Sequence, residues 1–185
     1  ITLAMDALSN PYTPNAGATP PVMVGREDQQ QSFDLLLARL ERGRTEQSMI
    51  VTGLRGVGKT VLLREFRKKA EAREWAIVEI EVSKHDDDDF RRQLAREFRS
   101  ALLQMSPKAR WTDRARRAAA VIRSFTINID PEGRITAGLD VGAEEGVGDS
   151  GDLTSDLTDL VVALGEAARE HEAGLVLLLD EIQFL

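Results

Sequence analysis

The spacing of apolar residues along the chain predicts helices that alternate with strands. Apolar and polar positions alternate over residues 75–83, which is typical of a strand with one buried face. Two short apolar runs, "SMIVTG" at 48–53 and "LVLLL" at 175–179, predict fully buried strands. Helices between such strands indicate an α/β fold with a mainly parallel sheet. The expected helices cover residues 27–41, 60–73, 84–105, 106–123 and 153–172.

Two segments are expected to depart from this alternation. Residues 8–22 hold four of the six prolines, so residues 1–22 are predicted to form an irregular arm ahead of a domain at 23–185. In residues 125–141, apolar positions alternate on both sides of Asp-Pro-Glu-Gly, which predicts a β-hairpin. Glycine and acidic residues at 142–152 are typical of a mobile loop. Residues 106–152 are therefore expected to form an insertion of helix, β-hairpin and acidic loop.

Composition narrows the possible functions. Of the 185 residues, 42% are hydrophobic and 30% are charged, as expected for one globular domain. The chain has no cysteine, which excludes disulfides and thiolate metal sites. Its two histidines, His85 and His171, are isolated, which argues against a zinc site. It has no apolar run of about 18 residues and no signal-peptide pattern, so a cytoplasmic protein without a membrane partner is expected. The net charge of −7 argues against nucleic-acid binding over the whole surface.

The sequence "GLRGVGKT", residues 53–60, carries the most specific chemical pattern in the chain. It fits G-x-x-x-x-G-K-[ST] between an expected strand and an expected helix. Glycines let the backbone curl so that N–H groups point into one concavity, and the helix N-terminus adds positive potential. Lys59 is expected to reach the β- and γ-phosphates, and the Thr60 hydroxyl to ligate Mg²⁺. The predicted nucleotide-binding residues are Gly53, Leu54, Arg55, Gly56, Val57, Gly58, Lys59, Thr60 and Val61.

Two carboxylates follow the last apolar run. Asp180 and Glu181 come directly after "LVLLL", at the C-terminal end of an expected parallel strand, where open α/β sheets bind their ligands. Asp180 is expected to hold Mg²⁺, directly or through water. Glu181 is expected to orient and deprotonate the water that attacks the γ-phosphate. Together with Lys59, these residues predict the hydrolysis of a nucleoside triphosphate.

These motifs resemble a known group of proteins. "GLRGVGKT" resembles a Walker A motif, and "LVLLLDE" resembles the Walker B motif of the AAA+ superfamily and its signalling relatives. "PPVMVGRED", residues 20–28, resembles the Gly-Arg-Glu element of the origin-recognition-like branch. The resemblance implies a P-loop NTPase fold of three αβα layers, with ATP as nucleotide and Mg²⁺ as metal. It also implies that Val24 and Gly25 line the adenine pocket, that Arg26 braces it, and that Tyr12 stacks on the base.

The chain departs from the family pattern in two ways. In the family, a strand with a polar sensor residue lies between the P-loop strand and the Walker B strand, and it comes later in the sequence. We therefore expect a sheet that is truncated after the Walker B strand and has an unfilled position beside the P-loop strand. Sensor, arginine-finger and lid residues have no counterpart up to Leu185, so the 185 residues are expected to be part of a longer protein. The predicted hairpin at 125–141 is the second departure.

Three functions remain compatible with the sequence. The first is an AAA+-like ATPase module that hydrolyses ATP to drive a conformational change, with self-association or a protein partner as its output. The second is a switch like the STAND NTPases, in which hydrolysis is slow and the bound ATP or ADP sets the signalling state. The third is a binding scaffold that uses the basic stretch 107–123 to contact nucleic acid or an acidic partner.

Overall fold

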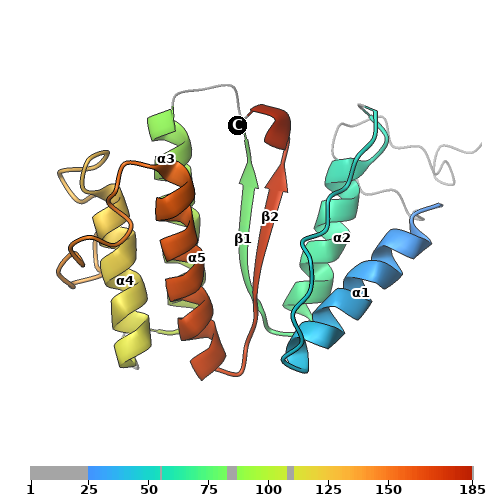
Figure 1. Ribbon diagram of the computed structural model, residues 1–185, viewed down its shortest axis with the longest axis horizontal. Coiled ribbons are helices and arrows are strands. Elements are labelled where there is room, and N and C mark those ends of the chain that lie inside the picture. The colour runs from blue at the N-terminus through green and yellow to red at the C-terminus, as the bar shows by residue number, and fades with distance from the viewer. Residues whose placement is uncertain (1–24, 55, 83–86, 108–110, 185) are drawn as a thin grey trace, which may run out of the picture. The chain divides into compact units, whose positions relative to one another are not determined.

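The computed structural model describes residues 25–54, 56–82, 87–107 and 111–184 (Figure 1). The chain divides into two compact units, residues 1–69 and 70–185, and each is described by itself. The elements are α1 (Glu27–Glu41), α2 (Lys59–Glu71), β1 (Ala76–Glu81), α3 (Asp87–Met105), α4 (Asp113–Thr126), α5 (Leu153–Glu170), β2 (Leu175–Asp180) and a short 3₁₀ helix, η2 (Ile182–Phe184).

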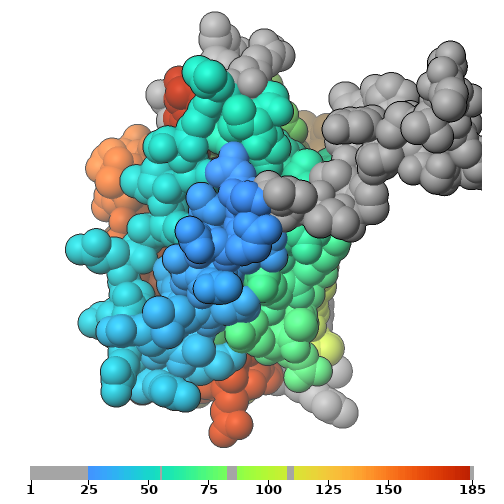
Figure 2. All heavy atoms as spheres, turned by 90° about the vertical axis from the view of Figure 1, so that its right-hand side faces the viewer, coloured from blue at the N-terminus to red at the C-terminus, as the bar shows by residue number. Residues whose placement is uncertain are grey.

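The first unit is built on the packing of α1 against α2. The rings of Phe33 and Phe66 are stacked, with centroids 4.1 Å apart and an interplanar angle of 14°. Both side chains are buried, and an ion pair between Lys69 Nζ and Asp34 Oδ2, at 2.5 Å, lies one turn or less further along each helix. Figure 2 shows the outer surface of α1 in blue, with residues 42–54 beside it in cyan. Apolar side chains at helical spacing therefore account for this helix pair.

The second unit is a two-stranded parallel sheet with α3, α4 and α5 on one side (Figure 1). The register pairs Ala76 with Leu175 at one end and Glu81 with Asp180 at the other. Val78 and Ile80 are fully buried on the side of the helices, as the alternating sequence of this strand predicts. The sheet therefore has both of its C-terminal strand ends at the same edge.

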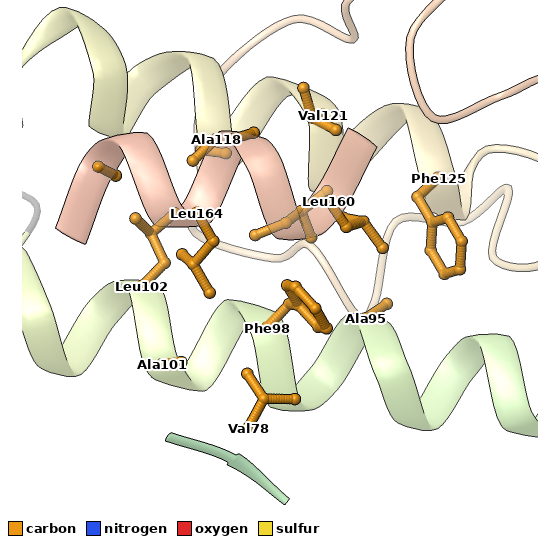
Figure 3. Close-up of a cluster of buried hydrophobic side chains, with 14 of the residues drawn as sticks. Val78, Ala95, Phe98, Ala101, Leu102, Ala118, Val121, Phe125, Leu160 and Leu164 are labelled. Carbon is orange, nitrogen blue, oxygen red and sulfur yellow. The ribbon is translucent and has the colours of Figure 1, made fainter. Parts of the chain in front are cut away.

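A single apolar cluster joins the three helices to the sheet (Figure 3). Phe98 of α3 lies among Val78 of β1 and Leu160 and Leu164 of α5. Helix α4 contributes mainly small side chains, which let helices approach closely. Its buried apolar residues are Ala115, Ala118, Ala119, Val121, Ile122 and Phe125.

The tight entry into the sheet depends on a glycine. A Cβ atom at Gly174, the residue before β2, would lie 2.3 Å from Cδ2 of the buried Trp75 ring. Ala76 N donates to Gly174 O at 2.8 Å, so the two strands begin their pairing at this point. Trp75 can cover the start of the sheet because Gly174 has no side chain.

Most of the predicted elements are confirmed, and the parallel α/β class is correct. The helices expected at 27–41, 60–73 and 153–172 are present with shifts of two residues or fewer. Asp87, Asp88 and Asp89 occupy the first turn of α3, where carboxylates favour helix formation.

The buried strand predicted at 48–53 is not formed. Residues 44–54 adopt no regular secondary structure, and Ile50 is 73% exposed. A strand exists only through hydrogen bonds to a neighbour, and the described sheet consists of β1 and β2. Residues 48–53 therefore have the composition of a strand but no neighbouring strand in the described sheet.

The β-hairpin predicted at 125–141 is wrong. Helix α4 continues to Thr126, because Phe125 completes the helical row Ala118, Val121, Ile122 rather than starting a strand. Turns follow: Asp130 O accepts from Gly133 N at 2.9 Å, and Asp130 Oδ2 accepts from Ile135 N at 2.6 Å.

Residues 127–152 are held in place by side chains of α3 instead of a strand ladder. Arg92 Nε donates to Ile129 O at 3.3 Å, Arg99 Nη2 to Ala137 O at 2.7 Å, and Arg91 Nη2 to Gly151 O at 3.1 Å. Of these three carbonyls, Gly151 O belongs to the acidic loop at 142–152, and the other two precede it.

Candidate functional site

The loop before α2 contains two glycines with a left-handed backbone. Gly56 and Gly58 have φ values of 82° and 81°, a left-handed conformation that strains any residue with a Cβ. Leu62 N donates to Gly58 O at 3.0 Å, so the helix begins directly at the second of these glycines. Alternation of left-handed glycines with other residues curls the loop at a helix N-terminus.

Lys59 lies over its own loop. Its Nζ donates to Gly53 O and to Leu54 O, each at 3.1 Å. The ammonium group is therefore placed at the loop it is predicted to serve, with backbone carbonyls as partners. Thr60, the predicted Mg²⁺ ligand, occupies the second position of α2 and is exposed.

The loop is open to solvent. Leu54 is 81% exposed and Val57 is 42% exposed, whereas Leu62, one turn into α2, is fully buried. Helix α2 is thus anchored through its apolar face, and the loop ahead of it remains accessible to a ligand. Arg55, also predicted to contact nucleotide, lies outside the described residues.

The Gly-Arg-Glu element contacts the same loop. Arg26 Nη2 donates to Val57 O at 2.9 Å, across 31 positions of sequence. Gly25 has a φ of 79° and donates from its N to Glu27 Oε1 at 3.3 Å. The predicted adenine-pocket residues Val24 and Tyr12 lie outside the described residues.

Asp180 and Glu181 lie at the C-terminal edge of the two-stranded sheet, as predicted. Asp180 is the last residue of β2, and its O accepts from Val82 N at 3.0 Å. Glu181 follows with a φ of 56°, a left-handed conformation that is uncommon for a residue with a side chain. Its backbone N donates to Asp180 Oδ1 at 2.9 Å, and its Oε2 accepts from Gln183 Nε2.

Sequence reasoning missed two neighbours of these carboxylates. Glu81 pairs in register with Asp180, so the two residues share a face of the sheet at its C-terminal edge. Gln183 of η2 holds the Glu181 carboxylate. The register of Glu81 could have been inferred from the two strand patterns, because C-terminal ends of parallel strands meet, whereas nothing in the local sequence marks Gln183.

A buried ion pair lies at the N-terminal end of α5. Asp156 is fully buried, accepts from Arg91 Nη1 at 2.9 Å, and accepts from Ser150 N and Ser150 Oγ at 2.8 and 2.7 Å. Burial by itself raises the pKa of Asp156, but the hydrogen bonds from Ser150 and Arg91 outweigh it and hold the pKa below its usual value. The Arg91 guanidinium also lies 5.2 Å from the centroid of the Phe125 ring. This network fastens the acidic loop to α3 and α5.

The basic stretch proposed as a binding surface has acidic neighbours. Lys108 and Arg110 lie outside the described residues. Arg114 and Arg116 lie 3.7 and 3.8 Å from the carboxylates of Glu170 and Asp113. Arg117 lies 3.3 Å from carboxylates of two residues, Glu144 and Glu166. These three arginines therefore have acidic side chains nearby, and exposed pairs of this kind are weak.

The predicted metal ligands are oxygen donors from two residues. Among them, no group of three or more His, Cys, Asp or Glu side chains is placed to hold a metal ion. A magnesium ion that binds with a nucleotide takes most of its ligands from phosphate and water, and it needs one or two protein oxygens. The Thr60 hydroxyl and the Asp180 carboxylate are oxygen donors of this type.

Comparison with known proteins identifies the class of protein. A family model described as AAA ATPase domain matches residues 22–185. The chain therefore belongs to the AAA ATPase domain family, whose members are nucleotide-binding ATPase modules. Neither the curated proteins nor the solved structures contain a match to the chain. Within the described part of the chain, no helix has the length and apolar character needed to cross a membrane.

Proposed function

We propose that the protein binds ATP together with Mg²⁺ and hydrolyses it to drive a conformational change. The observation that carries this proposal is the loop at 53–60: left-handed glycines at 56 and 58 stand at the start of a helix, with Lys59 placed over the loop. The family membership of residues 22–185 supports it. Adenine is preferred to guanine by resemblance, and Gly25 and Arg26 are its proposed neighbours.

The first unit would supply phosphate recognition. The backbone of residues 56–61 would offer N–H donors at the positive end of the α2 dipole. Lys59 would exchange its two carbonyl partners for the β- and γ-phosphate oxygens, which are stronger acceptors because they are charged. Binding of phosphate would therefore release the two loop carbonyls, Gly53 O and Leu54 O, from Lys59.

The second unit would supply the carboxylates for hydrolysis. Asp180 and the Thr60 hydroxyl would hold Mg²⁺, which when bound neutralises charge on the β- and γ-phosphates. Glu181 would take a proton from the attacking water. The water oxygen would bond to the γ-phosphorus, and the bond between the γ-phosphorus and the β–γ bridging oxygen would break. The carboxylate of Glu181 is already oriented by Gln183 and by the left-handed backbone.

Calorimetric titration tests the nucleotide site. ATP and GTP, each with Mg²⁺, are titrated into the purified chain and into Lys59→Ala, with circular dichroism to confirm that both are folded. Binding of ATP in preference to GTP, lost in Lys59→Ala, is the expected result. A folded chain that binds neither nucleotide would contradict the proposal.

One observation favours the alternative of a slowly hydrolysing switch. The Glu181 carboxylate, which would act as the base, accepts a hydrogen bond from Gln183. A base that keeps this partner takes a proton from water less readily. Single-turnover hydrolysis in Gln183→Ala distinguishes the two: a faster rate supports the switch, and a slower rate supports the ATPase, in which Gln183 orients the base. A neighbouring molecule that supplies an arginine finger could raise either rate about 10³- to 10⁵-fold.

A further inference from the structure

We propose that Arg26 is a positioning residue that keeps the phosphate loop in its binding shape, an inference that rests on the proposed nucleotide site. The Arg26 guanidinium donates to Val57 O at 2.9 Å. Val57 lies between the two left-handed glycines, Gly56 and Gly58. Arg26 therefore contacts the middle of the curled segment, through its backbone and not through a side chain.

The position of Arg26 follows from the packing of α1 on α2. Arg26 precedes α1 and contacts the loop that precedes α2, while Phe33 stacks on Phe66 and Asp34 pairs with Lys69. Later residues of α1 thus meet later residues of α2, so the helices run in the same direction (Figure 1). Because Phe33 and Phe66 are buried, the N-terminus of α1 is held beside the loop by a packed helix pair.

Arg26 and Lys59 hold different carbonyls of the loop. Lys59 holds Gly53 O and Leu54 O and would release them when it binds phosphate. Arg26 holds Val57 O, which Lys59 does not contact, so its bond can persist while the nucleotide binds. Lys59 would therefore move to the phosphate, and Arg26 would maintain the curled backbone of the loop.

The bond to Val57 O also acts on a neighbouring donor. The Val57 carbonyl and the Gly58 N–H belong to one planar peptide unit. A charged donor on the carbonyl polarises that unit and makes the N–H a stronger donor, since hydrogen bonds in a chain reinforce one another. Arg26 would in this way strengthen phosphate binding through Gly58 without touching the phosphate.

The test compares Arg26→Met, which keeps the aliphatic stem, with Arg26→Lys, which keeps a charged donor. Arg42→Met, at the other end of α1, removes the same charge and serves as the control. We expect Arg26→Met to weaken ATP and ADP binding equally, by about tenfold, as the loss of one charged hydrogen bond implies. Arg26→Lys should recover part of this loss, and Arg42→Met should bind like the unaltered chain.

A second readout tests the contact without nucleotide. In ¹⁵N–¹H spectra of the nucleotide-free chain, the Gly58 amide should shift in Arg26→Met and stay unchanged in Arg42→Met. An unchanged Gly58 amide in Arg26→Met would overturn the proposal. So would a loss larger for ATP than for ADP, which indicates direct phosphate contact, or a loss for adenine but not guanine nucleotides, which indicates bracing of the base. If the unaltered chain binds no nucleotide, the proposed function fails, and the Gly58 shift still decides whether Arg26 positions the loop.

Discussion

The core of the second unit and the loop of the first unit are stabilised in different ways. In residues 70–184, side chains from three helices and the sheet form one buried apolar cluster around Phe98. In residues 25–69, the loop at 53–60 is exposed, and hydrogen bonds from Arg26 and Lys59 reach its backbone carbonyls. Burial stabilises through many small contacts, whereas the loop depends on a few directed bonds. In the proposed function, such a loop exchanges its hydrogen-bond partners when phosphate binds, whereas the core keeps its contacts.

The largest expected effect comes from the core of the second unit. Phe98→Ala should lower the free energy of unfolding by about 3–5 kcal/mol, because a fully buried ring leaves a cavity. Both tryptophans, Trp75 and Trp111, belong to residues 70–185, so their fluorescence during urea unfolding reports on this unit. Leu35→Ala, at a side chain 60% exposed on α1, is the control. A similar loss in both variants would contradict the role assigned to the burial of Phe98.

The second effect belongs to the loop. Lys59→Ala should weaken ATP binding about 100-fold, since a cation that bonds two phosphate groups is lost. The urea midpoint of tryptophan fluorescence should stay the same, because Lys59 lies outside the apolar cluster of the second unit. Calorimetry and unfolding of the same sample check both statements. A variant that unfolds at lower urea would show that the loop also supports the core.

The third prediction concerns the buried ion pair. Asp156→Asn should destabilise the second unit by about 2 kcal/mol, because Arg91 loses a charged partner in a buried place. Urea unfolding followed by fluorescence measures the change, with the exposed Glu145→Gln as control. An unchanged midpoint would mean that the acidic loop is not fastened through Asp156.

The same carboxylate predicts a pH dependence. The pKa of Asp156 is lower in the folded chain than its usual value near 3.9, so the unfolded chain binds this proton more readily. Its contribution to stability is complete above about pH 5 and is lost as the pH falls through the folded pKa. The free energy of unfolding, measured from pH 7 to pH 3, should therefore fall less steeply with pH in Asp156→Asn than in the unaltered chain. Identical profiles for the two proteins would contradict the direction of the pKa shift.

The smallest expected effect concerns one glycine of the loop. Gly56→Ala should weaken ATP binding about fivefold, because alanine at a φ of 82° is strained by about 1 kcal/mol. Space is not the reason, since no atom lies within 4 Å of the added Cβ. Titration of ATP into this variant, beside Gly142→Ala in the second unit, checks the prediction. Equal affinities would mean that alanine is equally strained in the free and in the nucleotide-bound loop.

The local sequence alone predicted several helices, one strand and the position of the loop. Helical spacing placed α1, α2 and α5, alternation placed β1, and the motif at 53–60 located the loop, because each depends on residues near in sequence. The position of Asp180 and Glu181 at the C-terminal end of a strand could be predicted from the apolar run that precedes them.

The tertiary structure decided what depends on distant partners. Residues 48–53 have the composition of a strand, yet they form none without a neighbour to accept their hydrogen bonds. Residues 125–141 alternate like a hairpin, but the packing of Phe125 into the core keeps α4 helical, and Arg92 and Arg99 hold the carbonyls beyond it. The contact between Arg26 and Val57 likewise arises where α1 packs on α2. Local patterns specify the conformations a segment can adopt, and long-range contacts select among them, because a backbone hydrogen bond or a buried ring is stabilised by its partner.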